Sequence, residues 1–193
     1  MALNLLLGQT LYFEGDPFQK PWQEVTNHRQ DGAVLIDAGH IRAVGQRTKL
    51  LADFPEAKVN DYGNDLIIPG FVDAHVHYPQ TAIIASWGKR LIDWLNSYTF
   101  PEEMRLSNPT YADEVANRYL DIALAHGTTT MASYCTTAPA SVNSYFEAAE
   151  TRGMRVIGGK TCMDRNAPVG LIDTVERAYD ESKNLIDKWH GKG

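Results

Sequence analysis

Strand-like and helix-like runs alternate along the chain from Leu66 onward, and this alternation limits the folds that the sequence can adopt. The strand-like runs are 66–73, 128–134 and 154–160, and the helix-like runs are 87–98, 140–152 and 170–190, with a further one that follows Pro109 and ends near His126. A strand followed by a helix and another strand is typical of parallel βα units. We therefore expect an α/β fold in which this part of the chain forms about three such units.

Residues 1–66 have a different pattern, in which short β-type runs are separated by Gly, Asp, Asn and Pro. The runs are Leu5–Phe13, Gly32–Ile36, His40–Val44 and Lys58–Asp61. Short strands with turn residues between them indicate a small antiparallel sheet or part of a β-sandwich. The segment Asp37-Ala38-Gly39 lies between two of the runs and predicts a tight hairpin. We therefore divide the chain into a β-sandwich portion, 1–66, and a βα portion, 67–193.

Two histidines stand at the end of the first βα strand, in the run Pro69-Gly70-Phe71-Val72-Asp73-Ala74-His75-Val76-His77. Side chains two positions apart on a strand point to the same side, so His75 and His77 can direct two imidazoles at one point. Imidazole is a favoured ligand of Zn²⁺ and also suits iron. Barrels of βα units keep their active sites at the carboxyl ends of their strands. We predict a metal site here, and the alternative is a pair of histidines that only form hydrogen bonds in a loop.

The charge balance argues against several kinds of partner. The chain has 18 Lys and Arg residues against 24 Asp and Glu residues, a net charge of -6, and an acidic chain is a poor candidate for nucleic-acid binding. No apolar run approaches the roughly 20 residues of a membrane span, and the first residues lack the basic segment of a signal peptide. Cys135 and Cys162 are too few for a disulfide framework, and we expect both to be buried, unreactive thiols. These features predict a cytoplasmic protein without membrane or nucleic-acid partners.

Other notable residues have structural interpretations. Asp73 is expected to order the strand end through hydrogen bonds, and His126 precedes a strand at its amino end, where a barrel does not place catalytic groups. Tyr78 and Trp87 could wall a pocket, although aromatic residues at such positions more often belong to the core. The segment 100–103, Phe-Pro-Glu-Glu, is predicted to be a loop that leads into a helix, with its acidic residues near the helix N-terminus.

The run 69–77 resembles the first metal-binding motif of the amidohydrolase superfamily. Members of that superfamily hold a metal ion in a (β/α)8 TIM barrel flanked by a small β-sandwich, so the resemblance implies this fold, with only the first βα units present here. Further segments are similar to the guanine-deaminating members of the superfamily: 77–80, 91–103, 126–130 and 160–164. The stretch from Trp94 to Glu103 is far more specific than the H-x-H pattern, which many hydrolases share.

The resemblance implies roles for individual residues. His75 and His77 match zinc ligands, with one ion in a complete active site, and His77 also adjoins the substrate. Gln80 matches a glutamine that contacts the guanine ring, and its carboxamide offers donors and an acceptor to the edge of a purine. Without the resemblance, Gln80 would be interpreted as a surface amide. The implied reaction is attack of zinc-activated hydroxide on guanine to give xanthine and ammonia.

The resemblance also implies parts that this chain does not supply. A catalytic zinc site normally has three protein ligands, and His190 cannot be matched to one of them. The other ligands and a proton-shuttling glutamate are expected beyond Gly193, so we expect an amino-terminal part that is inactive alone, with an open sheet edge that favours association. The complete family members are often homodimers. Two alternatives remain: another amidohydrolase, such as a chlorohydrolase or an adenosine-type deaminase, or a non-catalytic fragment that pairs with a partner chain.

Overall fold

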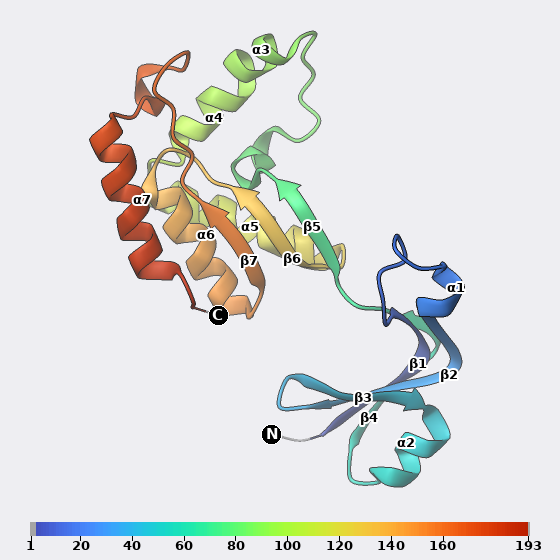
Figure 1. Cartoon of the computed structure of the whole chain (residues 1–193). Coiled ribbons are helices and arrows are strands. Elements are labelled where there is room, and N and C mark those ends of the chain that lie inside the picture. The colour runs from blue at the N-terminus through green and yellow to red at the C-terminus, as the bar shows by residue number, and fades with distance from the viewer. Residues whose placement is uncertain (1–2, 193) are drawn as a thin grey trace. The chain divides into compact units, whose positions relative to one another are not determined.

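The structure is a computed structural model that describes residues 3–192 and contains two compact units (Figure 1). The first unit extends to Pro69 and the second begins at Gly70. The dipeptide at this division belongs to no strand, and Pro69 has no backbone N–H with which to continue a ladder. None of the helices that the structure describes is long and apolar enough to cross a lipid bilayer.

The first unit is a four-stranded sheet with the strand order β3-β2-β1-β4. Its strands are β1 (Asn4–Phe13), β2 (Thr26–Asp37), β3 (His40–Gln46) and β4 (Lys58–Ile67), and its short helices are α1 (Trp22–Val25) and α2 (Arg47–Asp53). β2 is antiparallel to β1 and β3, but β4 is parallel to β1. The prediction of an antiparallel sheet is therefore wrong for β4. The reason is that the connection through α2 carries the chain from β3 past both β2 and β1 to the far edge of the sheet, where β4 runs in the direction of β1.

β2 and β3 form the predicted hairpin. Asp37 pairs with His40, and the two residues between them, Ala38 and Gly39, have φ angles of 50° and 84°. A two-residue turn with positive φ at both positions matches the twist of the strands that it joins. The side chains buried against this sheet include Leu5, Leu7, Ala33, Leu35 and Leu50. The alternating apolar residues of the strands therefore do form a small core of their own.

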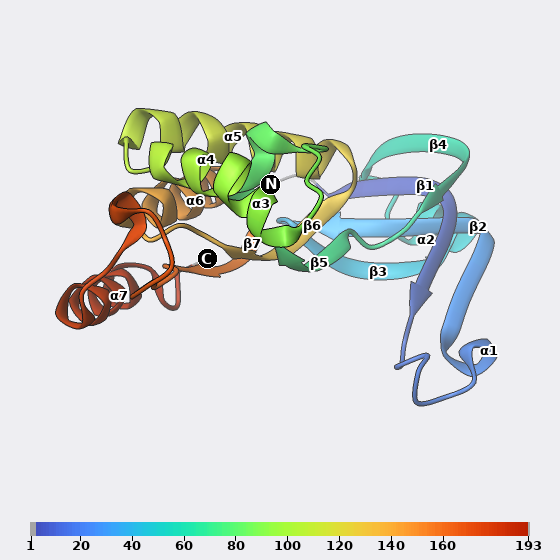
Figure 2. The same ribbon diagram turned by 90° about the horizontal axis from the view of Figure 1, so that it is seen from above.

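The second unit is built on a parallel sheet with the strand order β5-β6-β7. Its strands are β5 (Phe71–Val76), β6 (Thr128–Tyr134) and β7 (Arg155–Gly159), and its longer helices are α5 (Pro109–Ala125), α6 (Pro139–Arg152) and α7 (Val175–Trp189). α5 precedes β6, α6 connects β6 to β7, and both helices lie on one face of the sheet (Figure 2). The predicted series of βα units is confirmed, and the arrangement is that of part of a (β/α)8 barrel.

The apolar run 66–73 differs from its prediction in two ways. β4 ends at Ile67 and β5 begins at Phe71, so the run belongs to two strands rather than one. A Cβ atom at Gly70, between them, would lie 2.1 Å from Thr129 Oγ1, so this position accepts only glycine. A continuous apolar run is typical of a strand that is buried on both faces, but Phe71 is 55% and Val72 is 67% exposed. Two features account for this exposure. β5 is an edge strand with a neighbour on one side only, and α5 and α6 both pack on one face of the sheet, so that these helices do not cover the opposite face.

The helical segment between β5 and α5 starts later and runs further than predicted. It consists of α3 (Leu91–Trp94), the π-helical stretch η2 (Leu95–Thr99) and α4 (Phe100–Arg105), with helical backbone at both junctions. Residues 100–103 are therefore the start of α4 and not a loop, although the acidic residues do lie in its first turn. The predicted helix 170–190 is a 3₁₀ turn, η3 (Val169–Leu171), followed by α7.

Two stacked tyrosines lie in the core of the second unit. The rings of Tyr78 and Tyr145 are 5.0 Å apart and nearly parallel, and both side chains are fully buried. The Tyr78 hydroxyl donates a hydrogen bond of 2.6 Å to the Ser141 carbonyl oxygen, whereas the buried Tyr145 hydroxyl has no partner among the described residues. Burial raises the pKa of both phenols. Tyr78 is thus a core residue, as expected, but Trp87 is 76% exposed and is not.

The two tyrosines should respond differently to loss of the hydroxyl group. Tyr78→Phe removes the hydrogen bond to Ser141, so we expect the free energy of unfolding to fall by about 1 kcal/mol. Tyr145→Phe removes a buried hydroxyl without a partner, so we expect no loss, or a gain of about 1 kcal/mol. Urea denaturation followed by circular dichroism measures both values. Equal losses in the two variants would contradict this difference in hydrogen bonding.

Candidate metal and substrate site

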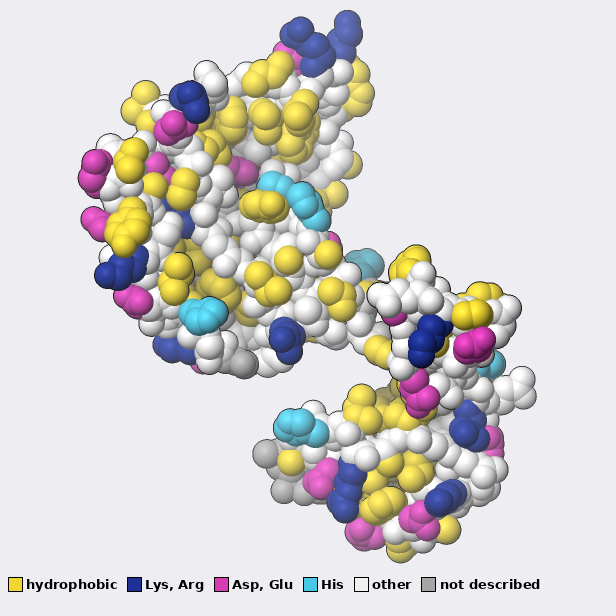
Figure 3. All heavy atoms as spheres, viewed as in Figure 1, with side chains coloured by type: hydrophobic (Ala, Val, Ile, Leu, Met, Phe, Trp, Pro, Cys, Tyr) yellow, Lys and Arg dark blue, Asp and Glu magenta, His cyan; other side chains and the backbone are white. Residues whose placement is uncertain are grey.

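His75 and His77 lie at the carboxyl end of β5. His75 belongs to the strand, and His77 directly follows Val76, the last residue of the strand. The centroids of the two imidazole rings are 5.5 Å apart, with 52° between the ring planes. Figure 3 shows histidine side chains at the surface of the second unit, beside hydrophobic ones. The structure therefore brings together the two imidazoles that the H-x-H pattern places on one side of a strand.

Asp73 holds the backbone next to this histidine pair. Its Oδ1 atom accepts a hydrogen bond of 3.1 Å from the backbone N–H of His75. The pairing of β5 with β6 is irregular between Asp73 and Val76, so the carboxylate satisfies a backbone donor where the ladder is interrupted. Asp73 therefore orders the strand end, as predicted.

Tyr134 completes the aromatic cluster and is a residue that sequence reasoning missed. It is the last residue of β6, and its ring stacks on His77 with 4.8 Å between centroids and 18° between planes. The Tyr134 ring is also 5.3 Å from that of His75. Burial, and after it the neighbouring His75, lower the pKa of His77, which favours the neutral imidazole that binds metals. The position of Tyr134 in the sequence could have indicated this role. Tyr134 ends β6, which is parallel to β5, so it lies at the same end of the sheet as the histidine pair.

A hollow of about 370 Å³ opens beside the histidine pair. Its lining includes His75, His77, Gln80, Ser86, Trp94 and Tyr119. Gln80 belongs to the 3₁₀ helix η1 (Tyr78–Ile83), and its Nε2 donates a hydrogen bond of 3.4 Å to Glu103 Oε1. The Trp94 indole N–H donates to the Ser86 carbonyl oxygen and holds that side of the hollow. Candidate metal donors and an amide that can recognise a polar ligand therefore face one space.

The donors at this site fit part of a zinc centre. Zinc accepts neutral imidazole as a ligand, and its protein sites are almost always tetrahedral. The lowered pKa of His77 suits such a role. In residues 3–192, however, no group of three or more His, Cys, Asp and Glu side chains could hold a metal ion. His75 and His77 would therefore need at least one further ligand that these residues do not bring to the pair.

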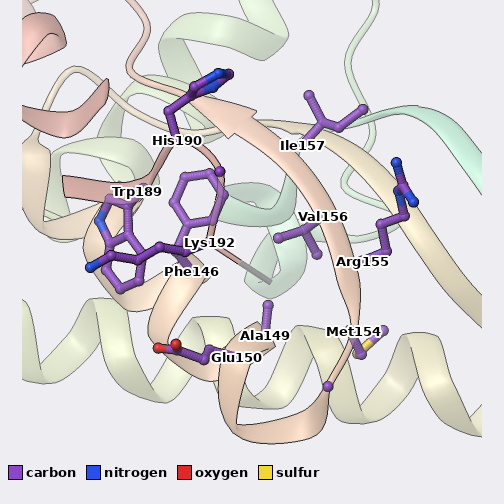
Figure 4. Close-up of a pocket in the computed structure, with 12 residues that line it drawn as sticks. Phe146, Ala149, Glu150, Met154, Arg155, Val156, Ile157, Trp189, His190 and Lys192 are labelled. Carbon is purple, nitrogen blue, oxygen red and sulfur yellow. The ribbon is translucent and has the colours of Figure 1, made fainter. Parts of the chain in front are cut away.

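A larger hollow, of about 550 Å³, lies between α6, the start of β7 and the end of α7 (Figure 4). Phe146 and Trp189 stack in its wall with 5.3 Å between ring centroids, and the Trp189 indole N–H donates to Asn143 Oδ1. His190 is the one His or Cys among its lining residues. The hollow adjoins the amino end of an edge strand, where barrels do not place catalytic groups. We therefore interpret it as a gap in packing beside β7.

The remaining candidate residues have structural roles, and one prediction fails. His126 lies between α5 and the amino end of β6, with its Nδ1 2.8 Å from the Ile122 carbonyl oxygen. Cys135 is buried, and burial raises the pKa of its thiol to about 12, so it stays unreactive. The prediction of a buried thiol is wrong for Cys162, which is exposed because it lies in the loop between β7 and α7.

Parallel βα units with a histidine pair at the carboxyl end of the first strand define a class of barrel-type hydrolases. Comparison of the sequence with models of known families supports this assignment. The model of the Amidohydrolase family matches residues 66–192. A model of the bacterial imidazolonepropionase-like composite domain matches residues 32–57, within the first unit. The chain therefore belongs to the amidohydrolase family.

Within that family, guanine deaminases are among the most similar proteins. The chain is 43% identical to the guanine deaminase of Escherichia coli K12 over 85% of its own length and 38% of that protein's length. The crystal structure of guanine deaminase from Bradyrhizobium japonicum matches with a TM-score of 0.95 and 37% identity, covering 100% of this chain and 42% of that one. A guanine deaminase from C. acetobutylicum with guanine bound in its active site matches with a TM-score of 0.86 and 26% identity, covering 99% and 44%. The chain thus spans about two fifths of the length of these relatives.

The ring of Tyr134 should strengthen metal binding by the histidine pair. Tyr134→Ala removes the ring that stacks on His77, so we expect the affinity of the chain for Zn²⁺ to fall by about tenfold, as on loss of an outer-shell partner. Tyr134→Phe keeps the ring and is the matched control, which should bind zinc as the unchanged chain does. Competition with a chromophoric chelator measures the affinities. If the alanine variant binds zinc as tightly as the phenylalanine variant, the stacking has no such effect.

Proposed function

We propose that a protein built on this chain hydrolyses guanine to xanthine and ammonia. The observation that carries the proposal is that His75, His77 and Gln80 line one hollow. The similarity to guanine deaminases, one of them with guanine in its active site, supports the choice of substrate. In this reaction water supplies the new oxygen atom of xanthine, and the exocyclic amino group of guanine leaves as ammonia.

The residues of this chain would have separate roles in that reaction. His75 and His77 would hold Zn²⁺, which when bound supplies an activated water molecule at neutral pH. Asp73 holds the backbone at His75, and Tyr134 supports the ring of His77. Gln80 would present its carboxamide to the polar edge of the base, where donors and acceptors alternate.

The proposal also states which part of the active site this chain supplies. The described residues bring two imidazoles together, whereas a catalytic zinc site normally has three protein ligands. We therefore propose that further ligands and the proton-transferring carboxylate come from residues outside this chain, and that the chain alone does not turn guanine over. A homodimer and a cytoplasmic location also remain predictions.

Assay of two proteins tests this function. A polypeptide translated from a reading frame that extends past codon 193 should release xanthine and ammonia in equal amounts from guanine when zinc is supplied, and the 193-residue chain should not. If the longer polypeptide leaves guanine unchanged, the proposed function is wrong. If the chain alone turns guanine over, the proposal that residues outside this chain complete the active site is wrong.

A substrate panel separates the related activities. Guanine, adenosine and a chlorinated triazine should be offered to the longer polypeptide at the same concentration, with guanine expected to be the preferred substrate. Preference for either of the other two would assign the chain to another amidohydrolase activity. Copurification of a second polypeptide that carries further histidines would instead favour a chain that pairs with a partner.

A further inference from the structure

Glu103, in the first turn of α4, has a carboxylate that is buried inside the second unit. The residue is 6% exposed, and its Oε1 accepts the hydrogen bond from Gln80 Nε2. Burial raises the pKa of Glu103, and the hydrogen bond from Gln80 opposes that rise. A buried carboxyl group is costly unless a donor is paired with it. The contact between η1 and α4 therefore stabilises Glu103 and restrains Gln80 at the same time.

This contact determines which end of Gln80 is free. A carboxamide has N–H donors at one end and an acceptor oxygen at the other, whereas an ionised carboxylate only accepts hydrogen bonds. Glu103 therefore holds the nitrogen end of the Gln80 amide through Nε2. The carbonyl oxygen of Gln80 makes no competing bond to Glu103 and is left for the hollow that Gln80 shares with His75 and His77.

We propose that Glu103 is a positioning residue, which holds the Gln80 carboxamide so that its carbonyl oxygen accepts a hydrogen bond from an N–H group of the bound purine. The inference rests on the proposed function, because guanine supplies that donor through its amino group or a ring N–H. Glu103 itself does not line the hollow. It acts through Gln80, and it sets which groups of a ligand match the site.

Glu102 provides a matched comparison. It is the neighbouring residue on α4 and is also buried, at 5% exposed. Its carboxylate, however, pairs with Arg105 at 2.8 Å and accepts a hydrogen bond from Tyr111. These partners belong to α4 and α5. A change at Glu102 therefore disturbs the same helix turn without removing the partner of Gln80.

Kinetics of the longer, zinc-loaded polypeptide test the role in substrate binding. Glu103→Leu removes the acceptor for Gln80, so we expect KM for guanine to rise about tenfold or more while kcat changes much less. Glu103→Gln keeps the shape but can donate as well as accept, and its effect on KM should be smaller. Combining Gln80→Ala with Glu103→Leu should add little to the effect of Gln80→Ala alone, because the two residues act as a unit. Glu102→Gln should leave KM unchanged.

The side-chain amide signals of Gln80 in the 193-residue chain test the positioning without any turnover. In a nitrogen–proton correlation spectrum, the signal of the hydrogen-bonded amide proton should move toward that of a free amide in Glu103→Leu. It should stay in place in Glu102→Gln. Thermal unfolding shows whether each variant is folded, and Glu103→Ala, which also removes the acceptor, takes the place of a leucine variant that is not.

The outcomes distinguish the two proposals. If the longer polypeptide does not hydrolyse guanine, the proposed function fails, and the assignment of a purine donor to Gln80 fails with it. If guanine is hydrolysed and Gln80→Ala raises KM but Glu103→Leu does not, the positioning role is overturned while the proposed function stands. Amide signals of Gln80 that do not move in a folded variant without the acceptor, Glu103→Leu or Glu103→Ala, also overturn the positioning role.

Discussion

Replacing Lys160 with methionine is expected to lower the free energy of unfolding of the second unit by about 3–5 kcal/mol. Lys160 directly follows β7, and its side chain is only 1% exposed. Methionine keeps most of the length of the side chain and removes its charge, so the buried carboxylate of Asp173 loses one of its two cations and Glu181 loses its ion pair with Lys160. Removing one partner of a buried ion pair is among the most destabilising single substitutions.

The expected loss is large because several groups depend on Lys160. Its Nζ lies 2.8 Å from Asp173 Oδ2 and 3.0 Å from Glu181 Oε2, and it donates a hydrogen bond to the Thr137 carbonyl oxygen. Asp173, with a side chain that is 2% exposed, also pairs with Arg177 at 2.8 Å. Burial alone raises the pKa of Asp173, but the hydrogen bonds from Lys160 and Arg177 outweigh it and hold the pKa below its usual value. The network joins the end of β7 to the loop that follows and to α7.

Urea denaturation followed by tryptophan fluorescence measures this loss. Arg165→Met is the matched control, because it also replaces a cation with methionine in the loop after β7. Arg165 and its partner Asp164 are 79% and 73% exposed, so the control should lose less than about 0.5 kcal/mol. A loss of less than about 1 kcal/mol for Lys160→Met, the range of an exposed ion pair, would contradict a buried network at this position.

The features that could be predicted from the sequence are those that depend on near neighbours in the chain. The alternation after Leu66 predicts the βα strands because each run carries its own periodicity. The H-x-H spacing alone places His75 and His77 on one side of a strand. The hairpin at Gly39 follows in the same way, because a short turn between strands requires positive φ.

The features that could not be predicted depend on contacts between distant segments. Tyr134 reaches His77 because β6 pairs with β5 in a parallel register that no local pattern sets. Glu103 reaches Gln80 because the π-helical stretch continues a helix where the proline at position 101 suggested a loop. Lys160 is buried because α7 and the loop before it fold against the end of β7. Each of these contacts lies in or beside the candidate site or supports the strand ends around it.

Replacing His75 or His77 with alanine should abolish guanine turnover by the longer polypeptide. Outer-shell partners of metal ligands already contribute about 10–100-fold, so loss of a ligand should lower kcat by more than about 100-fold. The zinc content of each purified variant should fall along with turnover, because two imidazoles 5.5 Å apart become one. A chelator should have the same effect on the unchanged polypeptide, and added Zn²⁺ should reverse it.

His126→Ala is the matched control for loss of a histidine. Its ring contacts the Ile122 carbonyl oxygen at the amino end of β6, whereas His75 and His77 lie at the carboxyl end of the parallel strand β5. The control should therefore keep both zinc and turnover. Full zinc content in His75→Ala and His77→Ala would show that the metal is held elsewhere, and lost turnover with retained zinc would make the pair a substrate contact rather than a metal site.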